Sequence, residues 1–300
     1  MTTSSGLLLI DKPRGLTSHD VVARVRRILH EKKVGHAGTL DPMATGLLVL
    51  AVGPATRLLR FAQSETKRYA GAVKFGVATD SLDADGAVID ERPVAVMTRE
   101  VVDAATSAML GPQLQTPPMV SAIKIDGQRL HELARRGLEV ERVPREITIT
   151  SFEVTPTEDD ALWRFEVVCS VGTYVRVLLS DLAARVGTVG HLVELRRLAS
   201  GSHRVEDALT LEELADRVGH GVNVLSPPAS FVTALEHVTL SEDQTRAMRM
   251  GQRVTLERSL GGEEVAAMDS RGDLVGILER RGDSWKPELV LVSRDESARG

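Results

Sequence analysis

The stretch GHAGTLDPMATGLLVLAVG, residues 35–53, constrains the fold more than any other part of the chain. Its second half contains an uninterrupted apolar run, Leu47 to Val52, which is far shorter than the ~20 residues of a membrane span and is typical of a buried strand. Its first half has two glycines and an Asp-Pro pair, which break helical periodicity and hold Asp41 in extended or turn backbone. The sequence therefore predicts an acid at the mouth of a buried strand, either as a turn former or as a functional carboxylate.

The composition excludes several classes of protein. With 300 residues, 42% of them apolar and 26% charged, the chain is long enough for one large folded domain, or for one domain and a small companion. Its N-terminus has neither the basic start nor the long apolar segment of a signal peptide. A single cysteine, Cys169, excludes an internal disulfide framework and a zinc site made of cysteines. We therefore expect a folded cytoplasmic protein that does not span a membrane.

Charge is distributed unevenly along the chain. Residues 1–60 carry a formal net charge of +5, whereas the whole chain carries −5, so the remaining residues sum to −10. A local basic face on an acidic protein fits selective docking of a phosphate backbone. Solvated helix faces are the alternative explanation, and charge alone does not separate the two.

Hydrophobic periodicity predicts alternating strands and helices over most of the chain. Residues 6–12 are typical of a short buried strand, and Thr17 to Asp20 supply N-cap residues for a helix that continues to Lys33 with a basic side. A strand is expected from Lys67, and another strand runs into a helix near Ser180. The remaining predicted elements are a helix at 98–110, a strand at 147–154 and a helix at 210–218.

A segment rich in glycine, proline and serine divides the chain. We expect a core domain over residues 1–222, a linker over 223–236 and a small C-terminal domain over 237–300. The C-terminal part combines a helix with short strands separated by glycine turns, which suggests a small β-barrel. Within the core, residues 121–146 are expected to form an excursion with a proline-rich entry and a basic exit.

Few motifs in the chain can carry chemistry. Glycine-rich phosphate loops and the G-x-S-x-G nucleophile motif do not occur, and the eight histidines have no metal-ligand spacing. What remains is Asp41, with candidate partners far along the chain in Tyr69, Tyr174 and Arg176. A ring that stacks on a base and an arginine that keeps a carboxylate ionised are the groups needed to work on a nucleobase. Taken singly, each of these residues also has a structural explanation, as a turn former, a half-buried strand residue or a surface ion pair.

Six segments together resemble one known family, the bacterial tRNA pseudouridine-55 synthases, or TruB family. In order between about residues 6 and 210, they are GLLLIDKPRGLTSHDVV, GHAGTLDPMATGLLVL, KRYAGAVKFGVATDSLDADG, PPMVSAIKIDGQRLHELARRG, CSVGTYVRVLLSDL and LRRLASG. The resemblance implies an α+β fold, with a mixed, mainly antiparallel sheet, flanking helices, a central cleft and a small C-terminal PUA-type RNA-binding domain. It also implies a monomer that binds the T-arm of tRNA and isomerises the uridine at position 55, without cofactor or metal. In that reaction the N1 glycosidic bond is cut, the base turns, and it is rejoined through C5.

The resemblance places catalytic roles on three residues. Asp41 matches the family's nucleophile, which attacks either C6 of the pyrimidine or C1′ of the ribose. Arg176 matches the arginine that follows G-T-Y in the family, and it would pair with Asp41 and keep that carboxylate ionised. Tyr69 matches the active-site tyrosine, whose ring can stack on the uracil and whose hydroxyl can help remove the C5 proton.

Four further matches concern substrate binding. Tyr174 and Leu195 would help to wall the pocket. Lys12 and His36 match basic positions near the bound RNA, and His36 could fill the space opened by a flipped nucleotide. One position departs from the family, because Val120 stands where an aromatic residue is usual, and any stacking role there is in doubt.

Two other functions stay open at the level of sequence. An RNA-binding protein or tRNA-folding chaperone with incidental catalysis needs no nucleophile, so the set Asp41, Tyr69 and Arg176 disfavours it. A carboxylate-based glycosidase would need a second acid as partner of Asp41. The chain offers acids such as Asp80, but no motif assigns one to that role.

Overall fold

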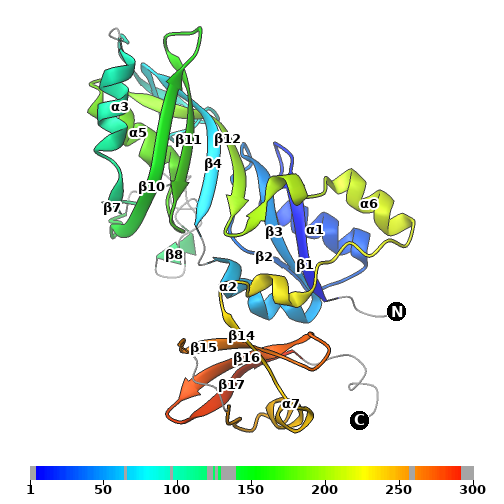
Figure 1. Ribbon diagram of the computed structural model, residues 1–300. Coiled ribbons are helices and arrows are strands. Elements are labelled where there is room, and N and C mark those ends of the chain that lie inside the picture. The colour runs from blue at the N-terminus through cyan, green and yellow to red at the C-terminus, as the bar shows by residue number, and fades with distance from the viewer. Residues whose placement is uncertain are drawn as a thin grey trace. The chain divides into compact units, whose positions relative to one another are not determined.

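The computed structural model describes residues 5–63, 66–94, 97–119, 124–125, 128–129, 140–256 and 261–291 (Figure 1). The chain forms two compact units. The first consists of Met1–Asp41, Leu47–Gln63 and Ser202–Gly300, and the second of Pro42–Gly46 and Ser64–Gly201. The chain therefore passes from one unit to the other directly after Asp41 and again inside the aliphatic strand that follows it.

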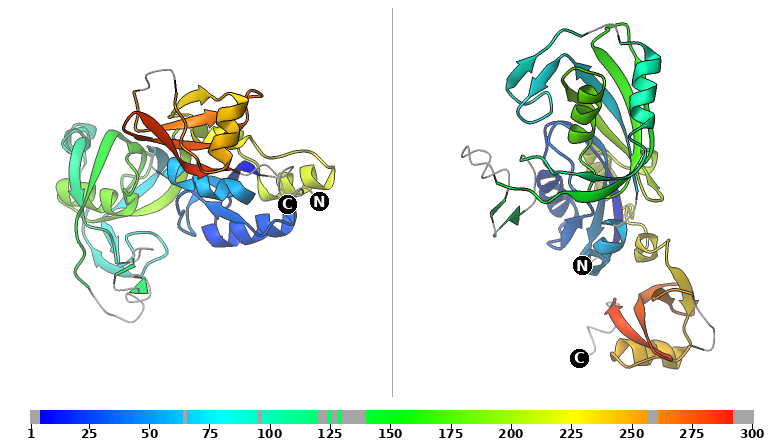
Figure 2. Two further views of the ribbon diagram at one scale, coloured as in Figure 1. Left: turned by 90° about the horizontal axis from the view of Figure 1, so that it is seen from below. Right: turned by 90° about the vertical axis from the view of Figure 1, so that its left-hand side faces the viewer.

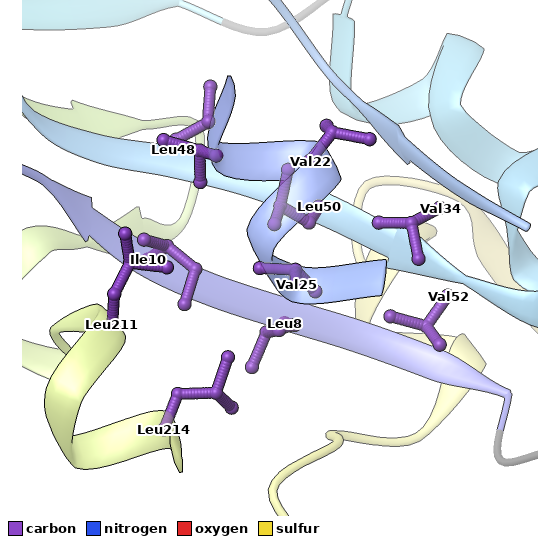
Figure 3. Close-up of a cluster of buried hydrophobic side chains, with 11 residues drawn as sticks. Leu8, Ile10, Val22, Val25, Val34, Leu48, Leu50, Val52, Leu211 and Leu214 are labelled. Carbon is purple, nitrogen blue, oxygen red and sulfur yellow. The ribbon is translucent and has the colours of Figure 1, made fainter. Parts of the chain in front are cut away.

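The first unit is built on the predicted aliphatic strand. Strand β3 (Thr45–Val52) is buried along almost its whole length and lies between β1 (Gly6–Lys12) and β2 (Val34–His36). Helices α1 (Ser18–Leu29) and α6 (Leu211–Gly219) pack beside these strands. Figure 3 shows the resulting core, in which side chains from all of these elements meet. Its labelled members are Leu8, Ile10, Val22, Val25, Val34, Leu48, Leu50, Val52, Leu211 and Leu214.

Helix α1 begins where the sequence predicts and ends earlier. Thr17 is the N-cap, and its hydroxyl accepts a hydrogen bond from the Asp20 amide in a capping box. The hydrogen bonds that Thr17 donates to the Asp20 carboxylate lower the pKa of Asp20. The predicted extension to Lys33 is wrong, because His30 takes a left-handed conformation, with φ 50°, and ends the helix after Leu29.

The second unit contains the larger part of the main sheet. Its strands follow the order β12 (Gly190–Ser200), β4 (Lys67–Phe75), β11 (Leu162–Cys169), β10 (Arg145–Pro156) and β7 (Gly111–Gln115), and all of these neighbours are antiparallel. The first residues of β3 pair with β12 in the parallel direction. Helices α3 (Arg99–Ser107) and α5 (Val175–Arg185) touch one another and cover one face of this sheet (Figure 2, right). The predicted mixed, mainly antiparallel sheet with flanking helices is therefore confirmed.

Helix α5 begins earlier than predicted. The sequence suggested that a strand runs on to a helix near Ser180, but β11 ends at Cys169 and a turn follows, with Gly172 at φ +86°. Tyr174 is the N-cap of α5, and the helix begins at Val175. Tyr174 is consequently not a strand residue, whereas Tyr69 does lie on a strand, β4.

The C-terminal residues form a separate sheet of four short strands. The order of the strands in this sheet is β14 (Glu236–Thr239), β15 (Glu264–Met268), β16 (Leu274–Arg281) and β17 (Ser284–Val290). Helix α7 (Glu242–Arg249) packs against β17 (Figure 1). A small core containing Met248 and Trp285 joins helix and sheet. The predicted boundaries at 222 and 236 stay a prediction, and the backbone of Ser226, inside that linker, exchanges two hydrogen bonds with Leu7.

Short elements complete the described chain. They are the 3-10 helices η1 (Gly53–Leu58), η2 (Val205–Asp207) and η3 (Pro228–Phe231), the helix α2 (Leu59–Gln63), and the strands β5 (Val77–Thr79), β6 (Val88–Glu91), β8 (Lys124–Ile125), β9 (Gln128–Arg129) and β13 (His203–Arg204). Most of the predicted excursion at 121–146, together with Val120, lies outside the described residues. No helix in the described part of the chain is both long enough and apolar enough to cross a membrane.

Gly46 of β3 lies opposite Arg197 of β12, and we predict that it tolerates no side chain. Its φ is +97°, and an added Cβ would meet the carbonyl oxygen of Arg197 and lie 2.8 Å from the Arg197 nitrogen. Gly187 is a matched control, because its φ is +84° and an added Cβ would meet nothing within 4 Å. We expect Gly187→Ala to cost about 1–2 kcal/mol through backbone strain, and Gly46→Ala about 1–3 kcal/mol more through the clash. Urea unfolding of both variants measures the difference, and equal losses would show that the approach of the two strands is not tight.

Candidate active site

The loop that carries Asp41 is anchored through the backbone of the preceding residue, Leu40. Ser18, the first residue of α1, is buried, and its hydroxyl accepts a hydrogen bond of 2.8 Å from the Leu40 amide and donates one of 3.2 Å to the Leu40 carbonyl. Both polar groups of the Leu40 backbone are thereby fixed. Beyond Asp41 the chain is anchored again, since Met43 and Ala44 are buried. Asp41 itself is half-buried and lies in a short segment that is constrained before and after it.

Tyr69 lies in the middle of the sheet of the second unit. It is opposite Val167 on β11 and opposite Arg197 on β12, and its exposed fraction is 9%. Side chains of directly opposed residues in an antiparallel pair lie on the same face, as do those of residues two apart on one strand. The register therefore places Tyr69, Arg197 and Leu195 on one face of the sheet, whereas the predicted roles of Tyr69 and Leu195 in a pocket stay predictions.

Arg176 forms a buried ion pair. Its guanidinium Nη1 lies 3.3 Å from Oδ2 of Asp83 and donates a hydrogen bond of 2.7 Å to the Ser81 carbonyl. The side chains are only 4% and 8% exposed, so a solvated surface pair, the structural explanation left open by the sequence, does not describe Arg176. Loss of one partner from a buried pair leaves an uncompensated charge, which typically costs about 3–5 kcal/mol.

The turn at residues 79–86 holds the Asp83 carboxylate in place. Its Oδ1 accepts hydrogen bonds of 2.6 Å from the Ser81 hydroxyl and 3.2 Å from the Asp85 amide. Leu82 has a φ of +63°, a conformation that is strained for a residue with a side chain, and its carbonyl accepts a bond of 3.1 Å from the Leu192 amide on β12. The turn is thus tied to the sheet, and its strained residue directly precedes the acid that pairs with Arg176.

Sequence reasoning missed Asp83. The segment TDSLDADG is visibly acid-rich, but it contains three aspartates and nothing in its composition separates them. In the structure Asp80 is exposed and its carboxylate accepts a hydrogen bond from the Ala87 amide, as expected of a turn former. Asp83 is the buried one.

Lys12 and His36 lie in the first unit, at the ends of β1 and β2. The Lys12 side chain is 0% exposed, and its ammonium donates to the carbonyls of Pro13, at 3.0 Å, and Leu16, at 2.7 Å. His36 is half-buried and packs edge to face against His19 of α1, with 5.5 Å between the ring centroids. Both side chains are therefore held by the structure around them, and their predicted contacts with RNA stay a prediction.

The single cysteine is a structural residue. Cys169 is buried at the end of β11, and burial raises the pKa of its thiol to about 11. A thiol with such a pKa is a poor nucleophile at neutral pH. Among the described residues, no group of three or more His, Cys, Asp or Glu side chains lies close enough together to hold a metal ion.

The seven predicted site residues divide between the two units. Asp41, Lys12 and His36 belong to the first unit. Tyr69, Tyr174, Arg176 and Leu195 belong to the second, where the sheet register relates Tyr69 to Leu195. The predicted pairing of Arg176 with Asp41 stays a prediction.

Comparison with protein families gives matches along nearly the whole chain. Residues 26–175 match the model described as "TruB family pseudouridylate synthase (N terminal domain)". Residues 176–224 match "tRNA pseudouridylate synthase B C-terminal domain", and residues 235–292 match "tRNA Pseudouridine synthase II, C terminal".

Individual relatives and solved structures agree with these matches. A tRNA pseudouridine synthase B of Streptococcus sanguinis is 41% identical over 96% of this chain and the whole length of that protein. The protein of the same name from Rhodococcus jostii is 42% identical over 98% of this chain and 96% of its own length. The crystal structure of a Cbf5-Nop10-Gar1 complex aligns with a TM-score of 0.75 at 25% identity, over 97% of this chain and 86% of that one. The chain therefore belongs to the TruB family of pseudouridylate synthases.

Proposed function

We propose that this pseudouridine synthase isomerises the uridine at position 55 in the T-loop of tRNA, with Asp41 as the nucleophile. The observation that carries the assignment is the anchoring of Asp41, since Ser18 fixes the preceding backbone and the residues after Pro42 are buried. A nucleophile held in this way loses little freedom when the substrate binds, which lowers the entropic part of the barrier. The resemblance further supports a cytoplasmic monomer that acts on the T-arm.

The proposed reaction needs no external reactant. The Asp41 carboxylate attacks either C6 of the uracil or C1′ of the ribose, and the N1–C1′ bond breaks. The base turns, a bond forms between C5 and C1′, and the carboxylate is released. The C5 proton leaves with help from the Tyr69 hydroxyl, and N1, which has lost its bond to C1′, takes up a proton, so product and substrate have the same composition. Arg176 supplies a fixed positive charge for the carboxylate, and its burial with Asp83 means that the charge is oriented before the substrate arrives.

Pseudouridine mapping tests this proposal. We expect the wild-type protein to convert a single T-loop uridine of unmodified tRNA, and Asp41→Asn to convert none while still binding the tRNA. The amide keeps the size and shape of the side chain but replaces one acceptor oxygen with an NH2 donor, and it is not nucleophilic. Chemical mapping of the product, with filter binding of the same variant, gives both results. Pseudouridine formed by Asp41→Asn would show that Asp41 is not the nucleophile. Modification elsewhere in the tRNA would contradict the assignment to position 55.

The basic face of α1 is proposed to contact tRNA phosphates. Arg24 and Arg27 of α1, and Lys32 and Lys33 just beyond its end, are all exposed, while Val21, Val22 and Val25 of the helix are buried. The helix therefore separates its packing face from its charged face. A uridine inside a folded loop must be flipped out, and phosphate contacts can fix the position of the RNA while that happens.

A second surface proposed for RNA belongs to the C-terminal sheet. A cavity of 680 Å³ opens between α7 and the turn after β15. Its lining residues are Glu242, Thr245, Arg246, Arg249, Met250, Asp269, Ser270 and Arg271. The three arginines outnumber the two carboxylates of the lining, Glu242 and Asp269, so that the hollow has a formal net charge of +1 and, beside the exposed Met250, suits a phosphate with an adjoining apolar group.

Salt dependence tests the basic face of α1. We expect Arg24→Gln/Arg27→Gln to weaken tRNA binding and to reduce the slope of log K against log salt by about 2, because each lost phosphate contact removes about 1. Arg99→Gln/Arg185→Gln removes the same charge from exposed positions on α3 and α5 and should leave the slope unchanged. Identical slopes for the two double variants would show that α1 does not contact phosphates.

A further inference from the structure

Gln115 is a buried polar residue for which neither the sequence motifs nor the proposed mechanism gives a role. It is the last residue of β7, the outermost strand of the sheet in the second unit, and its exposed fraction is 5%. Its backbone is held in register opposite Arg145 of β10. Burying an amide is unfavourable unless its groups find hydrogen-bond partners, so its contacts indicate what it is for.

Both ends of the Gln115 amide bind the backbone of one residue, Tyr174. The carbonyl oxygen Oε1 accepts a hydrogen bond of 2.8 Å from the Tyr174 amide, and Nε2 donates one of 3.2 Å to the Tyr174 carbonyl. This two-sided contact needs a donor and an acceptor on the same side chain, which an amide has and a carboxylate or an apolar group does not. It joins residues that lie 59 positions apart in the sequence.

Tyr174 is a point where a small rotation would have large effects. It is the N-cap of α5 and has no side-chain cap of its own, with φ −94° and ψ 104°. Its carbonyl also accepts the first hydrogen bond of the helix, 3.1 Å from the Leu178 amide. Gln115 therefore fixes the residue at which extended chain turns into helix, and Arg176 follows in the first turn.

Gln113 provides an internal comparison. It lies two residues earlier on β7, and its Nε2 donates a hydrogen bond of 2.7 Å to the Met109 carbonyl at the end of α3. The same side chain on the same strand thus makes one local bond, away from α5. The two hydrogen bonds of Gln115 to Tyr174 therefore depend on its position at the end of β7, since another glutamine on the same strand does not make them.

We propose that Gln115 is a positioning residue for the isomerisation. Its amide sets the backbone of Tyr174, and with it the direction of the Tyr174 ring and the start of the helix that carries Arg176. The proposal rests on the function assigned above, in which Tyr174 walls the pocket and Arg176 serves the reacting carboxylate. Misplacement of groups that orient a substrate lowers the rate of the chemical step, even where binding, which depends on a much larger surface, is retained.

The test compares Gln115→Met with Gln113→Met. Methionine keeps the length of the side chain and removes both hydrogen bonds to Tyr174. We expect the single-turnover rate at saturating tRNA to fall at least about tenfold in Gln115→Met, the effect of about one lost buried hydrogen bond on the barrier. The Kd for tRNA should stay within about twofold of wild type, and Gln113→Met should react at the wild-type rate.

A purely structural cap gives a different result. If Gln115 only stabilises α5, Gln115→Met will melt at a lower temperature, but its folded molecules will react at the wild-type rate, and the proposal is overturned. Gln115→Asn guards against a folding failure of the methionine variant, because it keeps a neutral amide but is one methylene shorter and cannot reach both backbone groups of Tyr174. A wild-type rate in either folded variant contradicts the proposal. Failure of the proposed function would give a different result, because the wild type would then not modify the T-loop uridine, or Asp41→Asn would still form pseudouridine.

Discussion

The buried ion pair between Arg176 and Asp83 is the interaction on which the site in the second unit depends. Two charges that are 4% and 8% exposed are stable only where their remaining hydrogen-bonding groups are satisfied, and here Ser81 and Asp85 supply the partners. The turn with the strained Leu82 meets this requirement, because it holds the Asp83 carboxylate beside the guanidinium of Arg176, a residue of the first turn of α5. The same turn hydrogen-bonds to β12, so helix, turn and sheet are fixed together.

Other candidate site residues, from distant parts of the sequence, are each held by their own support. Tyr69 is placed by the pairing of β4 with β11 and β12, and Gln115 holds Tyr174 from the edge of the sheet. In the first unit, Ser18 holds the backbone next to Asp41. Rigid support of this kind suits the proposed isomerisation, to which the protein would contribute positioning, a nucleophile and fixed charge.

Hydrophobic patterns and capping residues in the sequence predicted the elements that are determined by neighbouring residues. The aliphatic run of β3, the Thr17 cap of α1 and the strand that carries Tyr69 were all predicted, and the matched motifs identified the family. The errors concern helix ends that are set by the backbone conformation of one residue. These are His30, whose left-handed φ ends α1, and Tyr174, where α5 begins. Asp83 and Gln115 escaped prediction for another reason, since their partners lie 93 and 59 residues away. An aspartate in a turn and a glutamine before prolines look ordinary until the fold supplies those partners.

A double-mutant cycle between Arg176 and Asp83 tests the central claim most directly. The measured quantity is the single-turnover rate of pseudouridine formation at saturating tRNA for Arg176→Lys, Asp83→Asn and the double variant, each shown to be folded by its unfolding transition. If the pair acts as one unit, the double variant will be no slower than the slower single variant, and the coupling energy will be about 1–3 kcal/mol. If the losses of the two single variants multiply in the double variant, the residues act independently and the account is contradicted.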